Sequence, residues 1–297
     1  MPTDSEGQPL AILTVHAHPD DESSKGPATI ARYVAEGVRA VLVCCTGGEL
    51  GDILNPAMDT PEVRADLAGV RLRELDAATR VIGYDEVVHL GYRDSGMPDT
   101  EANADPLCFA RAELDEAVGR LATIIRRVRP QVMVTYAGDQ QGYPHPDHLR
   151  VHEISFPAVD MAADPSALPG GGEPWQVSKI YYVSWSRARI VAMHDKYLEL
   201  GLESPFDASW FERPSHDERI TTRIDISALP DVRAEALLAH ATQVDPTSRF
   251  WFGLPPEVAR TVYPMEDYEL ARSSVATELP EVDLFAGLRS RVGGPVR

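Results

Sequence analysis

The sequence predicts an α/β protein with a Rossmann-like, mostly parallel sheet, helices on both faces of that sheet and a smaller C-terminal cap region. Short apolar runs rich in β-branched residues alternate with longer stretches in which apolar residues recur at helical spacing. Parallel strands need crossover connections, and helices of this length supply them. Clusters of histidine and carboxylate follow two of the apolar runs, where open α/β sheets place their chemistry. With 297 residues, 43% of them hydrophobic, the chain can bury a large core.

The predicted strands and helices alternate along the chain. One helix begins at Pro27 and ends before Gly37, because proline suits the first helical turn and glycine suits the residue after the last. Gly83 ends a longer helix in the same way. The predicted strands are residues 10–15, 38–45, 87–90, 132–136 and 179–185. The predicted helices are residues 27–36, 61–82, 112–128, 190–200 and 231–243.

A stretch rich in glycine and proline, residues 164–174, is the clearest break in the chain, since it continues neither a helix nor a strand ladder. It divides a predicted catalytic α/β core, residues 1–165, from a cap, residues 175–297, that completes the substrate pocket. The tail from Ser273 onward carries no readable pattern, and the chain has no internal repeat.

Composition excludes several classes of function. The 28 basic and 46 acidic residues give a net charge of −18, and the basic residues are scattered, so we expect no nucleic-acid partner. Cys44, Cys45 and Cys108 lack metal or redox spacing and are expected to be buried, in a reducing compartment. Residues 1–9 lack the features of a signal peptide, and no apolar stretch approaches the roughly 20 residues of a membrane span. We therefore expect a cytoplasmic protein without a membrane partner; its oligomeric state is left open.

The two histidine clusters predict one metal site. His18 and Asp21 lie three residues apart in a turn after the first strand, and His148 follows a later strand. A hydrolytic zinc site needs about three nitrogen or oxygen ligands, and ferrous iron accepts the same set. Taken singly, each of these residues has a structural alternative, such as complementing a helix dipole. Two such clusters at strand ends favour the metal site.

The remaining polar residues of the clusters have predicted roles in hydrolysis. Asp20 would accept a proton from the attacking water, and His145 would donate to the leaving amine or stabilise the oxyanion. Asp147 would orient His145 through its second ring nitrogen, unless it serves only as a helix N-cap. Tyr143 would donate to the tetrahedral intermediate, although a packed loop tyrosine is an equal alternative.

Competing motifs are weaker. His148 and His152 have the four-residue spacing of zinc proteases, but Leu149 stands where those enzymes carry glutamate. We therefore interpret His152 as a residue that either supports the metal ligands from behind or packs in the core. The chain has no G-x-G-x-x-G fingerprint after its first strand and no G-x-S-x-G elbow. Neither a dinucleotide cofactor nor a serine nucleophile is expected.

The two motifs His-Pro-Asp-Asp-Glu at residues 18–22 and His-Pro-Asp-His at residues 145–148, in that order, resemble the PIG-L/LmbE-like family of zinc-dependent N-deacetylases and amidases. The resemblance implies a Rossmann-like sheet and a bound zinc ion. It implies a general base at Asp20 and an acid or electrostatic role for His145. The implied metal ligands are His18, Asp21 and His148.

Within that family the chain more closely resembles amidases that detoxify S-conjugates of the thiol mycothiol, on the evidence of residues 23–26, 47–49, 51–56 and 279–287. The similarity implies hydrolysis of the amide between an S-substituted N-acetylcysteine and glucosaminyl-inositol. Lys25, typically absent from the sister deacetylases, would contact the cysteinyl part. The candidates for binding sugar and inositol hydroxyls are Asp52, Arg71 and Asp94.

Three alternatives stay open. The chain has the residues needed to deacetylate N-acetylglucosaminyl-inositol or another amino sugar. The same residues also suit an LmbE-type amidase in antibiotic biosynthesis. A non-catalytic sugar- or metal-binding protein on this fold would not require Asp20 or His145 beside a complete set of ligands.

Overall fold

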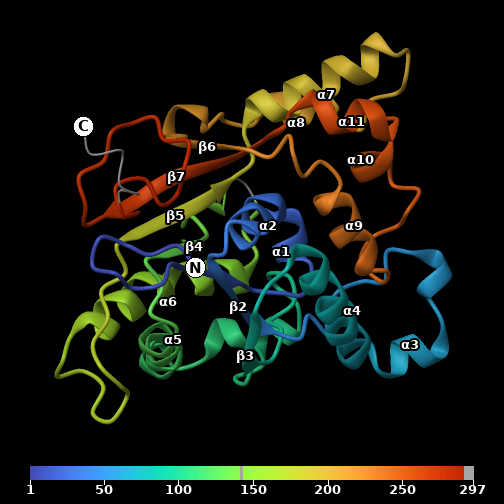
Figure 1. Cartoon of the computed structure of the whole chain (residues 1–297). Helices are drawn as coiled ribbons and strands as arrows, with labels where there is room; N and C mark the ends of the chain where they lie inside the picture. The colour runs from blue at the N-terminus through green and yellow to red at the C-terminus, as the bar shows by residue number, and fades with distance from the viewer. Residues whose placement is uncertain (141–142, 291–297) are drawn as a thin grey trace, which may run out of the picture.

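The computed structural model describes residues 1–140 and 143–290, which contain a seven-stranded sheet in the order β3-β2-β1-β4-β5-β7-β6 (Figure 1). The strands are β1 (Ala11–His16), β2 (Arg39–Thr46), β3 (Glu86–Tyr92), β4 (Val132–Thr135), β5 (Lys179–Ser184), β6 (Thr222–Asp225) and β7 (Met265–Ser273). Strands β1 to β5 pair in parallel, whereas β7 runs antiparallel to both β5 and β6. The predicted mostly parallel α/β fold is confirmed.

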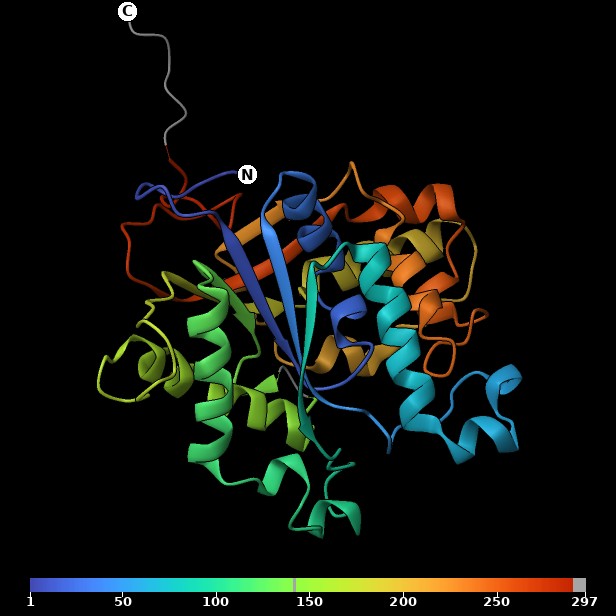
Figure 2. The same ribbon diagram turned by 60° about the horizontal axis from the view of Figure 1, so that its bottom comes forward.

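Helices cover both faces of this sheet. The longest are α2 (Pro27–Ala35), α4 (Leu67–Ile82), α5 (Leu114–Val128), α6 (Pro146–Ala163), α7 (Arg187–Glu199) and α9 (Val232–Ala239). Figure 2 shows α4 and α5 on opposite sides of the parallel strands. Helices α5 and α6 pack together over one face, and α4 packs against α9 over the other.

Side chains that alternate along the central strands supply one hydrophobic core to each face. Leu13 and Val15 of β1 join the core under α5 and α6, while Ile12 joins the core under α2. Every residue of β1 is therefore buried, as expected for a strand covered on both sides. The three cysteines are also buried and unpaired, in agreement with the prediction from their spacing.

The single helix predicted over residues 61–82 is wrong in one respect, because the chain forms two helices there. Helix α3 (Pro61–Ala65) ends at Asp66, which leaves the helical region at φ −137° and ψ 46°. The Asp66 carboxylate accepts a hydrogen bond from the Gly69 N–H and so caps the start of α4. An aspartate that satisfies a free N–H here stabilises a new helix rather than a continuous one.

The C-terminal part of the chain adds β5, β7 and β6 to the same sheet, and the strands β6 and β7 were not predicted. The tail after β7 also packs closely: the Glu281 carboxylate is buried and accepts hydrogen bonds from Lys179, Tyr181 and Thr222. The short helices of this region are α8 (Ala208–Glu212), α10 (Arg249–Phe252) and α11 (Pro256–Val262). The division of the chain into a core and a cap stays a prediction.

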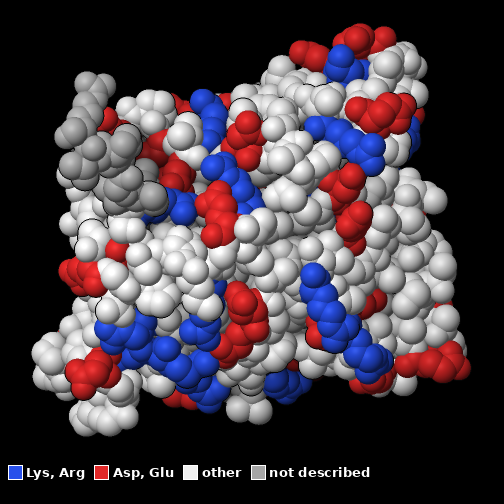
Figure 3. Space-filling model, in the orientation of Figure 1, with Lys and Arg blue, Asp and Glu red and all other residues white. Residues whose placement is uncertain are grey.

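The surface mixes charges of both signs. Figure 3 shows lysine and arginine side chains lying beside aspartate and glutamate side chains on one face. Several of these charges pair directly, as Arg260 does with Asp231 at 2.8 Å. Of the helices within residues 1–140 and 143–290, none combines the length and the hydropathy needed to span a bilayer.

Candidate metal centre and active site

The two histidine clusters meet at the carboxyl ends of β1 and β4. The connection after β1 continues to β2 on one side of β1, whereas β4 pairs with β1 on the other side. Open α/β sheets bind ligands in the crevice that such a switch in strand order creates. Residues from the turn after β1 and from the start of α6 line a common pocket of about 400 Å³ there, which we call the polar pocket.

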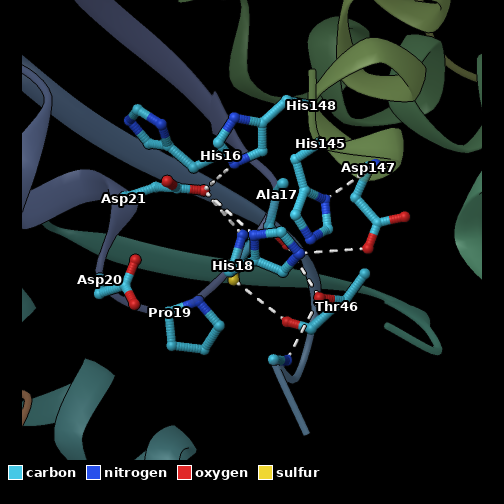
Figure 4. A network of polar contacts seen from close by, with 12 residues as sticks. His16, Ala17, His18, Pro19, Asp20, Asp21, Thr46, His145, Asp147 and His148 are labelled. Atoms are coloured by element: carbon cyan, nitrogen blue, oxygen red, sulfur yellow. Dashed lines mark hydrogen bonds and ion pairs between the residues drawn. The ribbon is translucent and has the colours of Figure 1, made fainter. Parts of the chain in front are cut away.

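His18, Asp21 and His148 place their side chains around one point (Figure 4). Asp21 Oδ2 lies 3.7 Å from His18 Nδ1 and 3.3 Å from His148 Nε2. One ligand atom from each residue lies within 4.8 Å of the others, and all three residues are buried. Two imidazole nitrogens and a carboxylate oxygen suit zinc and ferrous iron alike. The donor set therefore fits a divalent cation.

The charges around these residues favour a cation. Burial lowers the pKa of His18, but hydrogen bonds to Asp147 and Asp21 outweigh burial and raise that pKa to about 10. Burial raises the pKa of Asp21, yet Lys25 and His148 hold it well below its usual value. The surrounding carboxylates thus stabilise positive charge at the centre of the cluster.

A second group of possible ligands, His18, Asp94 and His145, is also present among the described residues. In this group the His18 atom that approaches Asp94 is Nε2, which lies 3.7 Å from the Asp94 carboxylate. The same nitrogen lies 3.1 Å from Asp147 Oδ2. Asp94 in turn accepts hydrogen bonds from the backbone N–H groups of Leu50 and Gly96. We favour the group formed by His18, Asp21 and His148, because Asp21 Oδ2 lies within 3.7 Å of a ring nitrogen of each of its two histidines.

Asp147 differs from its predicted arrangement. Its buried carboxylate faces His18 Nε2 and accepts hydrogen bonds from the Ser95 hydroxyl and N–H, whereas its backbone N–H donates to His145 Nδ1. Asp147 thus contacts His145 through its main chain: Pro146 and Asp147 form the first turn of α6, and the Asp147 carboxylate meets Ser95 in the loop after β3. A carboxylate on the outer nitrogen of a ligand histidine fixes the ring and raises its basicity.

We expect Asp147→Asn to weaken metal binding by about 10- to 100-fold, because an amide orients His18 less strongly than a carboxylate does. Competition with a chromophoric chelator measures this affinity. Asp160→Asn, near the exposed end of the same helix, is the matched control and should bind metal as the wild type does. Equal affinity in the two variants would show that the Asp147 carboxylate does not support the metal ligand.

His145 is arranged as a neutral hydrogen-bond donor. Its Nδ1 accepts the Asp147 N–H at 3.2 Å, which assigns the proton of the neutral ring to Nε2. Burial and the neighbouring rings of His18 and His148 lower the pKa of His145 to about 4. His145 lines the polar pocket and can donate to an oxygen that becomes negative there.

Asp20 stands beside the cluster in a strained backbone conformation. Its φ of 110° is rare for any residue with a side chain, and its N–H is held by Glu22 Oε2 at 3.0 Å. Glu22 is anchored in turn by His240 of the loop after α9, at 2.6 Å. Burial raises the pKa of the Asp20 carboxyl; Arg71 opposes this shift and Asp21 adds to it.

Arg71 holds Asp20 in place. Its guanidinium donates to Asp20 Oδ2 at 2.9 Å and to the backbone oxygens of Pro19 and Gly48. The side chain is buried, and both of its terminal nitrogens donate to the protein itself, whereas Nε has no hydrogen-bond partner among the described residues. These contacts change the role that we propose for Arg71 from binding polyol hydroxyls to positioning Asp20.

The other candidates for polyol binding, Asp52 and Asp94, both line the polar pocket. Asp52 is exposed at the rim, whereas Asp94 is buried close to His18. The Lys25 ammonium lines the same pocket. The pocket therefore offers several charged acceptors to a polyhydroxylated group.

Lys25 and Tyr143 lie between the candidate metal centre and a second pocket. The Lys25 ammonium contacts Asp21 Oδ1, and it lies 5.7 Å from the centre of the Tyr136 ring. The Tyr143 side chain is 54% exposed, and its ring lies 5.6 Å from that of His148. Both residues line the polar pocket and the second pocket.

Two further histidine and tyrosine side chains, those of His152 and Tyr136, lie near the candidate ligand His148. His152 donates from Nδ1 to the Tyr136 carbonyl and packs near Phe156, which confirms it as a packing residue. Tyr136 itself was missed: its hydroxyl meets His16 Nδ1 at 2.9 Å, and its ring stacks on His148. Its position directly after β4 is the signal that could have identified it.

Comparisons with known proteins agree with this geometry. The family model PIG-L, described as GlcNAc-PI de-N-acetylase, matches residues 13–159. The chain is 45% identical, over 94% of its length and 98% of the relative, to a Streptomyces coelicolor protein named mycothiol S-conjugate amidase. It is 41% identical, over 93% of its length and 97% of the relative, to a 1D-myo-inositol 2-acetamido-2-deoxy-alpha-D-glucopyranoside deacetylase of Geodermatophilus obscurus. The N,N'-diacetylchitobiose deacetylase of Pyrococcus horikoshii shares the fold, with a TM-score of 0.59 at 18% identity over 88% of this chain and 83% of that one.

Proposed function

Because the chain belongs to the PIG-L (GlcNAc-PI de-N-acetylase) family, we propose that it is a metal-dependent amidase acting on mycothiol S-conjugates. The reaction would release an S-substituted N-acetylcysteine and glucosaminyl-inositol. The observation that carries this proposal is the convergence of His18, Asp21 and His148 beside Asp20 and His145 at one end of the sheet. A bound zinc or ferrous ion would lower the pKa of a water molecule and polarise the amide carbonyl.

The surrounding residues carry the proton transfers. Asp20 accepts the proton of the attacking water, because its carboxylate is held beside the cluster by Arg71. His145 donates its Nε2 proton toward the oxygen that becomes negative as the tetrahedral intermediate forms. Tyr143 can donate a second hydrogen bond from the pocket rim. The protonated Asp20 then supplies the proton that it took from water to the departing amine.

Two observations support a conjugate as the substrate. The relative named as an amidase is 45% identical to the chain, compared with 41% for the deacetylase cited above. Lys25 stands beside Asp21 where a group attached to the scissile carbonyl would pass. The competing proposal, deacetylation of N-acetylglucosaminyl-inositol, is supported by the close identity of those deacetylases and uses the same proton-transfer residues.

The test of the proposed function compares kcat/KM for a mycothiol S-conjugate and for N-acetylglucosaminyl-inositol, with products identified by mass spectrometry. Each reaction is run on metal-loaded protein and after treatment with a chelator. We expect a metal-dependent preference for the conjugate. A preference for the acetylated sugar would replace this proposal with a deacetylase, and inactivity toward both would overturn both assignments.

We expect Lys25→Met to reduce kcat/KM for the conjugate by roughly 10-fold or more and to change that for the acetylated sugar by less than about 3-fold. The loss reflects one charged hydrogen bond to the cysteinyl part, a contact that an acetyl group cannot make. Methionine preserves an unbranched apolar stem near Tyr136. Because Lys25 also contacts Asp21, the metal content of each preparation must be measured. Equal losses on both substrates would assign Lys25 to the metal centre instead of to substrate choice.

A further inference from the structure

A second pocket of about 400 Å³ adjoins the candidate metal centre, and its chemistry differs from that of the polar pocket. Besides Tyr136 and Tyr143, four aromatic residues from the C-terminal part of the chain line it: Trp185 after β5, Trp210 on α8, and Phe250 and Trp251 on α10. We call it the aromatic pocket. Its volume lies within the range of small-molecule sites, roughly 300 to 1,000 Å³.

The two pockets share a boundary at the reacting centre. Lys25, Tyr143 and His148 line both of them, so each pocket reaches the same candidate metal ligand. A bound amide with its carbonyl at this boundary has two arms, one on the nitrogen and one on the carbonyl carbon. The boundary therefore allows the two arms to occupy different pockets.

We propose that the aromatic pocket binds the S-linked group of the conjugate and makes the enzyme selective for aromatic and other bulky apolar S-substituents. This inference rests on the proposed function. The polyol arm has hydroxyls that match the charged lining of the polar pocket, whereas an apolar arm gains by leaving water for the aromatic one. The cysteinyl carbon chain passes Lys25 and Tyr143 on its way between them.

The geometry of the aromatic side chains supports a preformed binding surface. The rings of Trp185 and Phe250 are nearly parallel, at 11° with centroids 5.8 Å apart. Trp251 stands perpendicular to Phe250 at 4.8 Å, and Trp210 lies 5.7 Å from Phe250. Rings that already pack on one another lose little freedom when a further ring stacks against them.

The pocket also separates the two candidate reactions. The acyl arm of an acetylated sugar is a single methyl group, which is far too small to fill the aromatic pocket. An S-substituted N-acetylcysteine extends well beyond the carbonyl and can reach the tryptophans. The presence of this pocket beside Lys25 and the candidate ligand His148 thus favours a large acyl arm.

The experiment compares an S-benzyl and an S-methyl conjugate of mycothiol in the wild type and in two variants. Trp251→Ala removes one wall of the aromatic pocket, and Val183→Phe narrows the pocket from β5. We expect each variant to lower kcat/KM for the benzyl conjugate by roughly 10- to 100-fold, and that for the methyl conjugate by less than about 3-fold. Phe252→Leu is the matched control: this neighbour of Trp251 lines a different cavity and should leave both values unchanged.

A binding measurement provides a readout that does not depend on turnover. Calorimetry on chelator-treated protein compares the affinities of the two intact conjugates, and we expect the benzyl conjugate to bind at least about 10-fold more tightly in the wild type but not in Trp251→Ala. Thermal melting confirms that the variants are folded.

The outcomes separate this inference from the proposed function. Two results would overturn the assigned role of the aromatic pocket and leave the proposed amidase activity intact. One is cleavage of both conjugates with equal efficiency, and the other is an equal loss of kcat/KM for both conjugates in Trp251→Ala and Val183→Phe. Cleavage of the acetylated sugar alone would overturn the amidase, and with it the pocket assignment.

Discussion

Replacing Asp20 with asparagine is expected to lower kcat by about 10²- to 10⁴-fold while the protein keeps its metal. The amide retains the shape of the carboxylate and can still accept the hydrogen bond from Arg71, but it cannot take a proton from water. Asp20 is not a member of either group of possible metal ligands among the described residues. Turnover should therefore fall without a matching loss of metal.

The measurement pairs kcat with metal analysis of the same preparation. Asp76→Asn, on the exposed face of α4 where Asp76 pairs with Arg80, is the control for loss of a surface carboxylate. Normal turnover by Asp20→Asn would remove Asp20 as the base. Loss of metal in that variant would make Asp20 a contributor to the metal site.

Replacing Asp21 with asparagine is expected to release the metal and to abolish activity. Asp21 supplies the carboxylate between His18 and His148, and its other oxygen contacts the Lys25 ammonium. A neutral amide oxygen is a much weaker ligand for zinc than a carboxylate is. We therefore expect a loss of metal affinity larger than the roughly 10- to 100-fold that outer-shell contacts contribute.

Metal content after dialysis, together with kcat on re-addition of zinc, checks this expectation. Asp94→Asn serves as the comparison, since Asp94 belongs to the rival group of possible ligands. Retention of metal by Asp21→Asn and its loss from Asp94→Asn would reverse the assignment of the metal centre.

Local patterns in the sequence were sufficient for the parallel half of the fold. Strands β1 and β2 consist mostly of apolar residues because both of their faces are buried, and apolar residues recur at helical spacing in the helices between the strands. Helix α3 was merged with α4 because the break depends on one capping contact of Asp66, which apolar periodicity does not report. Strand β7 was missed because much of it is only partly buried and therefore lacks a continuous apolar run.

The candidate site was predictable to the extent that its residues lie close together in the sequence. The turn after β1 and the start of α6 each carry several chemically active residues. Both segments follow parallel strands whose carboxyl ends meet at one edge of the sheet, so the two segments are expected to lie side by side. Contacts between distant segments could not be predicted, because no local pattern connects the parts of the chain that they join. Examples are the contacts of Ser95 with Asp147, of His240 with Glu22 and of Arg71 with Asp20. The aromatic pocket likewise assembles from α8, α10 and the end of β5.

The most direct test of this account is to locate the metal by anomalous diffraction from crystals of the zinc-loaded protein. The account predicts one strong peak bounded by Asp21 Oδ2, His18 Nδ1 and His148 Nε2, at the boundary between the polar and aromatic pockets. A peak bounded instead by Asp94, His145 and the other nitrogen of His18 would contradict it, since neither Asp94 nor His145 lines the aromatic pocket.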